Sequence, residues 1–292
     1  MWRTWRDKYM NIAMVLAGGV GRRMGAKTPK QFIKVLGKPV IVYTLETIQN
    51  NPNIDAIEVV TVGSFLDEVA TYKDEYGINK LRWITPGGDS CQDSIRNGIF
   101  NLEGKIAPSD IVCMIMSVTP LISDDVINDS IRVCKEHGNA IAGSYPIYNF
   151  STIKKGGSDP SSTGETQQAP RVGSVTDHGL TEGASYIWAD DIIKKEEHVD
   201  LNLPWTFPLE KLSWAYHKAY DEGLETLSSS YTTNLMIALG EKLYFSKDTQ
   251  RNKLKLTTFD DVDMLEGYLL IQELRKGNID SAKLIRMNPT DA

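Results

Sequence analysis

The sequence predicts an α/β fold with a doubly wound, mostly parallel sheet and helices on both faces. Two observations support this prediction. Short apolar runs alternate with amphipathic stretches of helical spacing through the first half of the chain, which is typical of βαβ units. A glycine-rich segment directly follows the first apolar run, at the edge of the sheet where such folds bind ligands. The 292 residues are enough for one sizeable core, and we expect one domain.

Five apolar runs in the first half are expected to be strands that are buried on both faces of the sheet. They are residues 12–16, 56–62, 81–84, 111–116 and 140–144. Four stretches between them have apolar residues at helical spacing and are expected to be crossover helices. They are residues 40–49, 66–76, 90–102 and 124–137, the last with Ser123 as its N-cap. Right-handed crossovers would leave the carboxyl ends of the strands free to form a ligand crevice.

The regular pattern stops at residues 155–174, which are rich in Gly, Ser, Thr, Pro and Gln and have no period. We interpret this stretch as a mobile loop or an arm. The pattern returns with expected helices at 209–222, 233–239 and 259–276 and an expected strand at 242–246. The predicted organisation is an extension at 1–9, a domain at 10–276 with an arm at about 148–183, and a tail at 277–292.

The charge balance disfavours polyanionic partners. Thirty-two Lys and Arg residues against 38 Asp and Glu residues give a net charge of −6, so neither nucleic acid nor an anionic membrane is expected to bind. Three cysteines without a CxxC pair and four histidines argue against a zinc site. The chain has no run long enough to span a bilayer, and its first residues lack the features of a secretory signal. We therefore expect a cytoplasmic protein.

The strongest motif is the glycine-rich segment Leu16-Ala17-Gly18-Gly19-Val20-Gly21-Arg22-Arg23-Met24-Gly25, with Pro29-Lys30-Gln31 close behind. Small residues let the backbone approach phosphate oxygens, and successive N–H groups can form an anion-binding nest. Arg22, Arg23 and Lys30 would add positive charge. A glycine turn with solvated basic side chains is the structural alternative. Neither the P-loop pattern nor the dinucleotide fingerprint fits this spacing.

Together with further motifs, this segment makes the chain resemble the cytidylyltransferase family that includes methylerythritol-phosphate and ribitol-5-phosphate cytidylyltransferases. The resemblance covers most of residues 11–270 and is weakest in the Gly/Ser-rich stretch. It implies a fold of the nucleotide-diphospho-sugar transferase type and a homodimer with projecting arms. The further motifs are Pro29-Lys30-Gln31-Phe32, Leu36-Gly37-Lys38-Pro39-Val40-Ile41, Pro86-Gly87-Gly88-Asp89 with Ser94, and Lys253-Leu254-Lys255-Leu256-Thr257-Thr258 followed by Asp260-Asp261.

The resemblance also implies roles for individual residues. The first loop would bind the triphosphate of CTP through Leu16, Ala17, Gly18, Gly19, Val20 and Gly21. A second group would bind the cytosine and the ribose; it consists of Gly88, Asp89 and Ser94. Arg23 and Lys30 would stabilise the charge that develops on the α-phosphorus, and Lys255 would hold the acceptor phosphate with help from Thr152. Mg²⁺ is expected to accompany CTP, and no protein residue is assigned as its ligand. Without the resemblance, Gly88 would be interpreted as part of a turn and Lys255 as an exposed strand residue.

The sequence departs from the family pattern at several positions near the expected acceptor and metal. Met116 stands where a His-Asp-Ala-x-Arg-Pro-like motif has its acidic residue, and Asn252 stands at a second acidic position. Of an expected Arg-Asp-Thr motif in the arm only Thr152 is kept, and Thr232-Thr233-Asn234 replaces a Thr-Asp-Glu/Ala motif. These changes leave the identity of the acceptor open.

Four functional hypotheses follow. The leading one is a CTP-dependent cytidylyltransferase acting on a polyol or sugar phosphate for a surface polymer of the teichoic-acid type. Methylerythritol phosphate, used in isoprenoid synthesis, is the rival acceptor. A catalytically weakened nucleotide-binding protein is a hypothesis of another class, motivated by Met116. A dinucleotide-dependent oxidoreductase is remote, because Thr61-Val62-Gly63-Ser64 offers no acidic residue for a ribose after the second strand.

Overall fold

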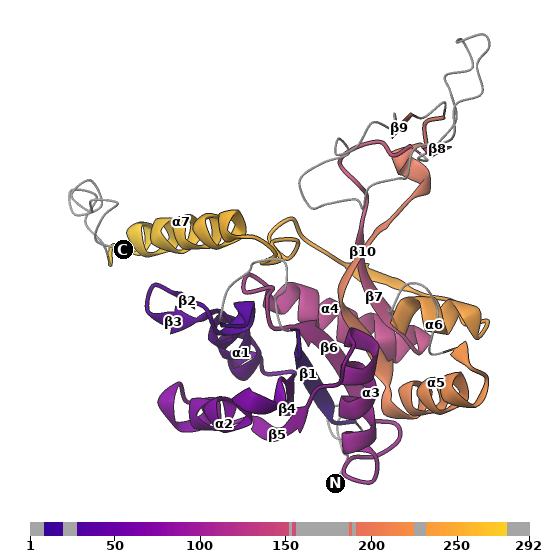
Figure 1. The fold of residues 1–292 in the computed structure, drawn as a ribbon, viewed down its shortest axis with the longest axis horizontal. Helices are drawn as coiled ribbons and strands as arrows, with labels where there is room; N and C mark the ends of the chain where they lie inside the picture. Colours follow the sequence, from indigo (N-terminus) through magenta and orange to yellow (C-terminus); the bar gives the residue numbers. More distant parts are fainter. Residues whose placement is uncertain are drawn as a thin grey trace, which may run out of the picture. The chain divides into compact units, whose positions relative to one another are not determined.

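Seven strands form the central sheet of the computed structural model, in the order β11-β7-β10-β6-β1-β4-β5 (Figure 1). β1 is parallel to both of its neighbours, β4 and β6, and β4 is parallel to β5. The chain runs outward from β1 through β4 to β5 and then crosses to β6 on the other side of β1. This reversal confirms the doubly wound, mostly parallel sheet. The strands are β1 (Asn11–Ala17), β4 (Ala56–Thr61), β5 (Leu81–Pro86), β6 (Ile111–Met116), β7 (Ala140–Ser144), β10 (Asp200–Pro208) and β11 (Phe245–Lys247).

The structure describes residues 9–19, 28–151, 154–155, 187–188, 191–224 and 232–278. Contacts divide the chain into two units, one made of Met1–Gly143 with Leu201–Ala292 and the other of Ser144–Asp200. The expected extension 1–9, except for its last residue, lies outside the described residues, as do nearly all of 155–174 and of 277–292. The expected arm at about 148–183 belongs to the range of the second unit.

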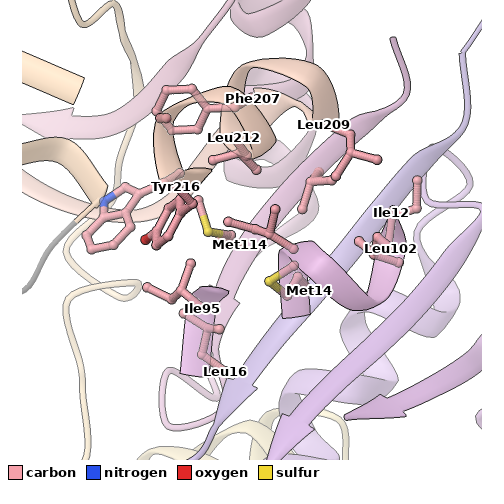
Figure 2. Packing of buried hydrophobic residues seen from close by; sticks show 14 of the residues in the cluster. Ile12, Met14, Leu16, Ile95, Leu102, Met114, Phe207, Leu209, Leu212 and Tyr216 are labelled. Carbon is pink, nitrogen blue, oxygen red and sulfur yellow. The ribbon is translucent and has the colours of Figure 1, made fainter. Parts of the chain in front are cut away.

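The apolar side chains of β1 alternate between two separate cores. Ile12, Met14 and Leu16 contribute to the first core, in which Ile95, Leu102, Met114, Leu212 and Tyr216 pack closely (Figure 2). Ala13, Val15 and Ala17 contribute to the second core on the opposite face of the sheet. This alternation is the two-residue period of a strand buried on both faces.

Helices cover both faces of the sheet, as expected. The first core is completed by α3 (Cys91–Leu102), α5 (Leu209–Asp221) and α6 (Thr232–Ala238), and the second by α1 (Val40–Asn50), α2 (Leu66–Glu75) and α4 (Asp124–His137). Ser123 occupies the N-cap position of α4, but its side chain makes no capping hydrogen bond. Gly138, with φ of 83°, ends that helix in the left-handed conformation that glycine adopts without strain.

A third, smaller core joins the end of the chain to the sheet. Val118, just after β6, packs with Val35, Val40, Leu256 and Leu265. These residues come from the antiparallel pair β2 (Lys34–Val35) and β3 (Lys38–Pro39), from α1, and from α7 (Phe259–Arg275) with the segment before it. The segment that contains Lys255 is thereby held at the carboxyl end of β6.

Two expectations about the sheet are wrong, and one strand was not among those expected. That strand is β10, whose Pro204 and Pro208 lack the N–H groups that a central strand donates; the stretch paired with β6 begins after Pro204. β5 was expected to be buried on both faces, but it is the edge of the sheet and Arg82 is exposed. The strand expected at 242–246 is the short β11, which begins only at Phe245.

The second unit contains a small antiparallel pair of strands. β8 (Lys154–Lys155) pairs with β9 (Ile187–Trp188), and an isolated bridge joins Phe150 to Ile193. Large apolar side chains are exposed in this unit, among them Tyr145, Ile147, Tyr148 and Ile192. In the described part of the chain, no helix combines the length and the apolar character that a membrane span requires.

Candidate nucleotide-binding site

The candidate site lies where the sheet reverses its direction of winding. The carboxyl ends of β1, β4, β5 and β6 meet at one edge because these strands are parallel. A ligand of a doubly wound sheet binds in the crevice outside such a switch point. The loop that follows β1 is the glycine-rich segment, so the strongest sequence motif is located at the position that the fold reserves for a ligand.

Gly18 lies against the start of α3. A Cβ atom added to Gly18 would be 2.7 Å from Oγ of Ser94, and one added to Gly87 would be 3.0 Å from the same oxygen and 3.4 Å from Cα of Gly18. The distance at Gly18 is shorter than real Cβ contacts, and those at Gly87 are tighter than most, so a side chain at either position would require its neighbours to move. The loops after β1 and β5 therefore touch at their backbones.

Ser94 ties the loop after β5 to the start of α3 through hydrogen bonds, and it packs against Gly18 of the loop after β1. The N–H group of Gly88 donates to Ser94 Oγ at 3.0 Å, and the Ser94 hydroxyl donates to the Ser90 carbonyl at 2.9 Å. Ser94 is buried, and Ser90 caps α3 by accepting from the N–H group of Asp93. Asp89 is exposed on the same loop. The structure thus brings Gly18, from the glycine-rich segment, together with Gly88 and Ser94, from the second motif.

Asp93 links the start of α3 to α5. Its carboxylate accepts from the Ser90 hydroxyl at 2.7 Å and from the Tyr220 hydroxyl at 3.0 Å, and Arg96 lies 3.6 Å away. These hydrogen bonds, with that of Ser90 the largest cause, lower the pKa of Asp93 below its ordinary value. Asp93 is therefore an ionised carboxylate in the first turn of α3, where a negative charge interacts favourably with the helix N-terminus.

Lys30 reaches the far end of the chain. It belongs to the 3₁₀ turn η3 (Lys30–Phe32), and its Nζ donates to the Leu256 carbonyl at 2.7 Å, across 226 positions of sequence. The Leu256 N–H group in turn donates to the Val118 carbonyl at 3.0 Å. Lys30 was predicted to stabilise the charge at the α-phosphorus, and Lys255, which precedes Leu256, to hold the acceptor phosphate. The structure brings the segments of these two residues into contact.

The charge of Lys255 acts on the first residue of α3. Desolvation raises the pKa of the Cys91 thiol, and the positive charge of Lys255 acts on that thiol in the opposite direction.

Some of the remaining predicted site residues are not described by the structure. Val20, Gly21, Arg23 and Thr152 lie outside the described residues. Leu16, Ala17 and Gly19 are described, and they lie at the end of β1 and in the loop that follows it.

The turn after β6 has a packing role where relatives have an acidic motif. Met116 is half-buried and contacts two of the cores, and Val118 is buried in the third. Backbone groups of the turn are satisfied locally, because Ser117 N–H donates to the Leu16 carbonyl at 3.1 Å and the Thr119 hydroxyl donates to the Met116 carbonyl at 2.8 Å. This turn offers no carboxylate to a ligand.

Asn252 is fully buried, and its side chain has a structural role. Its amide donates to the Leu203 carbonyl and to Asp248 Oδ1, each at 2.7 Å. An aspartate at this position could make neither bond and would put a second carboxylate against Asp248. Among the residues that the structure describes, no three side chains of the metal-ligating types gather into a group.

The sequence analysis assigned no role to Gln31, although it is buried directly beneath the glycine-rich loop. The sequence signal for such a role was a glutamine next to the apolar Phe32. A polar side chain that is buried beside an apolar residue needs hydrogen-bond partners. Its partners are the backbone carbonyls of that loop.

A doubly wound sheet with a glycine-lined switch point, approached by lysines from two distant segments, defines a nucleotide-binding α/β protein. Residues 11–172 match the family described as "IspD: 2-C-methyl-D-erythritol 4-phosphate cytidylyltransferase". A ribitol-5-phosphate cytidylyltransferase from Lacticaseibacillus paracasei is 35% identical over 265 residues, which cover 91% of this chain and 100% of that relative. The chain therefore belongs to this cytidylyltransferase family and, with it, to the nucleotidyltransferase enzymes.

Other relatives match about half of the chain. A ribitol-5-phosphate cytidylyltransferase from Vibrio parahaemolyticus is 42% identical over 145 residues, 49% of this chain and 61% of the relative. A 2-C-methyl-D-erythritol 4-phosphate cytidylyltransferase from Clostridium botulinum is 33% identical over 136 residues, 47% of this chain and 58% of the relative. The matched part spans less than two thirds of each of these two proteins.

Solved structures confirm the fold. The 4-diphosphocytidyl-2C-methyl-D-erythritol synthase from Anaerococcus prevotii superposes with a TM-score of 0.66 and 17% identity, covering 90% of this chain and 100% of that one. The 2-C-methyl-D-erythritol 4-phosphate cytidylyltransferase from Francisella tularensis gives a TM-score of 0.61 at 19% identity, covering 88% and 98%. At these identities the similarity establishes the architecture alone.

Proposed function

We propose that this enzyme transfers CMP from CTP to a polyol phosphate, with ribitol 5-phosphate as the first acceptor to consider. The observation that supports this choice most strongly is the match to the Lacticaseibacillus paracasei relative, which extends over 91% of the chain. The methylerythritol-phosphate relative from Clostridium botulinum matches 47% of the chain. The acceptor lysine, Lys255, lies in the second half, so the full-length match includes both ends of the proposed reaction.

The chemistry would be an in-line displacement. An oxygen of the acceptor phosphate attacks the α-phosphorus of CTP, the bond from that phosphorus to the bridging oxygen breaks, and pyrophosphate leaves with the electron pair. Catalysis of this kind depends mainly on positioning and on neutralising charge. Lys30 and Arg23 are proposed to stabilise the nucleotide phosphates, and Lys255, with Thr152, is proposed to hold the acceptor phosphate.

Lys30 also contacts the segment that is proposed to hold the acceptor. Its Nζ donates to the Leu256 carbonyl at 2.7 Å, and Lys255 directly precedes Leu256 in the chain. Through this bond Lys30 would position the acceptor segment beside the nucleotide phosphates.

The proposal also includes a metal ion, an oligomeric state, a location and a biosynthetic role. Mg²⁺ is proposed to accompany CTP and to be held by phosphate oxygens and water, since Mg²⁺ often keeps few protein ligands. A homodimer is proposed because the second unit exposes Tyr145, Ile147, Tyr148 and Ile192. A cytoplasmic location and a role in making precursors of a surface polymer are proposed from the ribitol-phosphate relatives.

Pyrophosphate release with a panel of acceptors tests the proposal. CTP and Mg²⁺ are supplied with ribitol 5-phosphate, methylerythritol phosphate or a hexose phosphate, and kcat/KM is compared. We expect kcat/KM for ribitol 5-phosphate to be at least about tenfold higher than for methylerythritol phosphate. Preference for methylerythritol phosphate would support the second candidate acceptor and contradict ours.

A second candidate function is a nucleotide-binding protein of weak or no catalytic activity. Met116 and the buried Asn252 favour it, because both replace carboxylates of the family pattern. CTP binding by calorimetry without pyrophosphate release for any acceptor in the panel would support this function and exclude the transferase.

A further inference from the structure

Gln31 contacts the backbone of the glycine-rich loop from below. Its side chain is 1% exposed, and Nε2 donates to the Ala17 carbonyl at 2.5 Å and to the Gly19 carbonyl at 2.9 Å. A glutamine amide has two hydrogens, so this one group uses its whole donor capacity on two carbonyls of the same loop.

These two bonds fix the orientation of the loop. In a planar trans peptide the C=O and N–H groups point in opposite directions. The Ala17 carbonyl points to Gln31, so the N–H group of Gly18 points away from it. A loop that presents N–H groups to an anion must turn carbonyls the other way, and buried carbonyls need donors. Gln31 supplies such donors behind the loop.

Gln31 is itself held on both sides. Phe32 is buried and its ring stacks on that of Phe65, with centroids 4.1 Å apart and planes 9° from parallel. Lys30 donates to the Leu256 carbonyl. The Phe32 N–H group donates to the Pro29 carbonyl at 2.9 Å and closes the turn. Three consecutive residues therefore contact the acceptor segment, the nucleotide loop and the apolar core.

We infer that Gln31 is a positioning residue that sets the shape of the triphosphate-binding loop of this transferase. It touches neither substrate, and it acts through the Ala17 and Gly19 carbonyls. This inference rests on the proposed function, because it requires the loop to bind the triphosphate of CTP. Its consequence is specific: losing the Gln31 amide should weaken CTP binding and leave acceptor binding nearly unchanged.

Two variants of Gln31 test the inference. Gln31→Met keeps the length and most of the volume of the side chain and removes both donors. Gln31→Glu keeps the shape; its neutral form can donate one hydrogen bond, whereas its ionised form can donate none and is repelled by the carbonyls. The matched control is Gln49→Met at the end of α1. It removes the acceptor of a different hydrogen bond, which Lys80 N–H donates to Gln49 Oε1 at 2.8 Å.

KM for CTP, KM for ribitol 5-phosphate and kcat are measured for each protein, with CTP affinity from calorimetry. We expect Gln31→Met to raise the KM and Kd for CTP about tenfold or more, and the acceptor KM less than about twofold. Gln49→Met should match the wild type in every value. In Gln31→Glu the Kd for CTP should rise with pH relative to the wild type, because the side chain loses its donor on ionisation.

The inference is overturned if folded Gln31→Met binds CTP as the wild type does, or if both KM values rise in parallel. If Gln31→Met does not fold, the test is the pH dependence of CTP binding by Gln31→Glu. A ratio of its Kd for CTP to that of the wild type that does not change with pH rejects the inference. Failure of the proposed function has a different signature, since the wild type itself would then neither bind CTP nor release pyrophosphate.

Discussion

At the scale of single residues, Glu58 is a carboxyl group buried within the sheet. It lies on β4, is 0% exposed, and its Oε1 accepts from the Thr85 hydroxyl at 2.7 Å and from Asn101 Nδ2 at 2.8 Å. Desolvation raises its pKa from 4.5 to about 7, although these hydrogen bonds and the charge of Lys105 act in the opposite direction. The folded protein therefore holds a proton on Glu58 at pH values where the unfolded chain has lost it.

This predicts the pH dependence of stability. Between pH 4.5 and about 7 the folded state binds more protons at Glu58, so its contribution to the free energy of unfolding is largest below pH 4.5 and is lost as the pH rises toward 7. Glu58→Gln mimics the neutral acid. It should raise the free energy of unfolding at pH 8, by up to about 3 kcal/mol, and change it far less at pH 5.

Urea denaturation of both proteins at pH 5 and pH 8 measures this difference. An equal effect of Glu58→Gln at the two pH values would show that Glu58 does not titrate between them in the folded protein.

Predictability from sequence differed among the site residues. Gly18, Gly88 and Ser94 could be grouped because each belongs to a recognisable short motif, and the structure joins them. Gln31 could not be assigned, since its role depends on which carbonyls lie above it, and those are fixed only by the fold. Asn252 appeared as a lost acidic residue, whereas its amide is required by Leu203 and Asp248, which no local pattern indicates.

At the scale of elements, α3 is packed so closely on the sheet that one of its positions has no side chain. A Cβ added to Gly98 would be 2.7 Å from Cγ2 of Val60 and 3.0 Å from Sδ and Cε of Met14. The Met14 side chain can move at its end, but the short branched side chain of Val60 cannot. α3 starts at the site and supplies Ser94, so its distance from the sheet also sets the position of the Ser94 hydroxyl.

Gly98→Ala should therefore destabilise the protein. The intrinsic helix propensity of alanine favours the change by about 1 kcal/mol, but overpacking a core costs about 1–3 kcal/mol, so we expect a net loss of about 1 kcal/mol. The matched control is Gly267→Ala in α7, where an added Cβ meets nothing within 4 Å. It should be neutral or stabilising by up to about 1 kcal/mol. Thermal unfolding of both variants gives the comparison, and destabilisation of the two by the same amount would refute the packing explanation.

Some helices and strands could be predicted from local sequence patterns alone, and others could not. β6 and α4 have the predicted bounds, because a continuous apolar run and a helical period with a capping residue are both local signals. β10 was missed because its antiparallel place beside β6 is a tertiary outcome, and its prolines contradict local strand propensity. The edge position of β5 is likewise set by strand order, which the sequence of the strand does not contain.

At the scale of the whole molecule, one side of the site is close to the family pattern and the other departs from it. The loop after β1, the loop after β5 and the start of α3 form the proposed nucleotide site, where the backbones of the two loops lie close together. The turn after β6 and the buried Asn252 contribute packing and structural hydrogen bonds instead of carboxylates. The segment with Lys255 nevertheless reaches this site, through the Leu256 bonds to Lys30 and Val118. The chain therefore retains the connection between the two ends that transfer requires.

Identification of the reaction product tests the central claim most directly. The enzyme is incubated with CTP, Mg²⁺ and ribitol 5-phosphate, and the mixture is analysed by mass spectrometry alongside a pyrophosphate assay. We predict CDP-ribitol and pyrophosphate in equal amounts, with neither formed when the acceptor is omitted. Free CMP or CDP without the conjugate, or recovery of both substrates unchanged, would contradict a cytidylyltransferase that acts on this polyol phosphate.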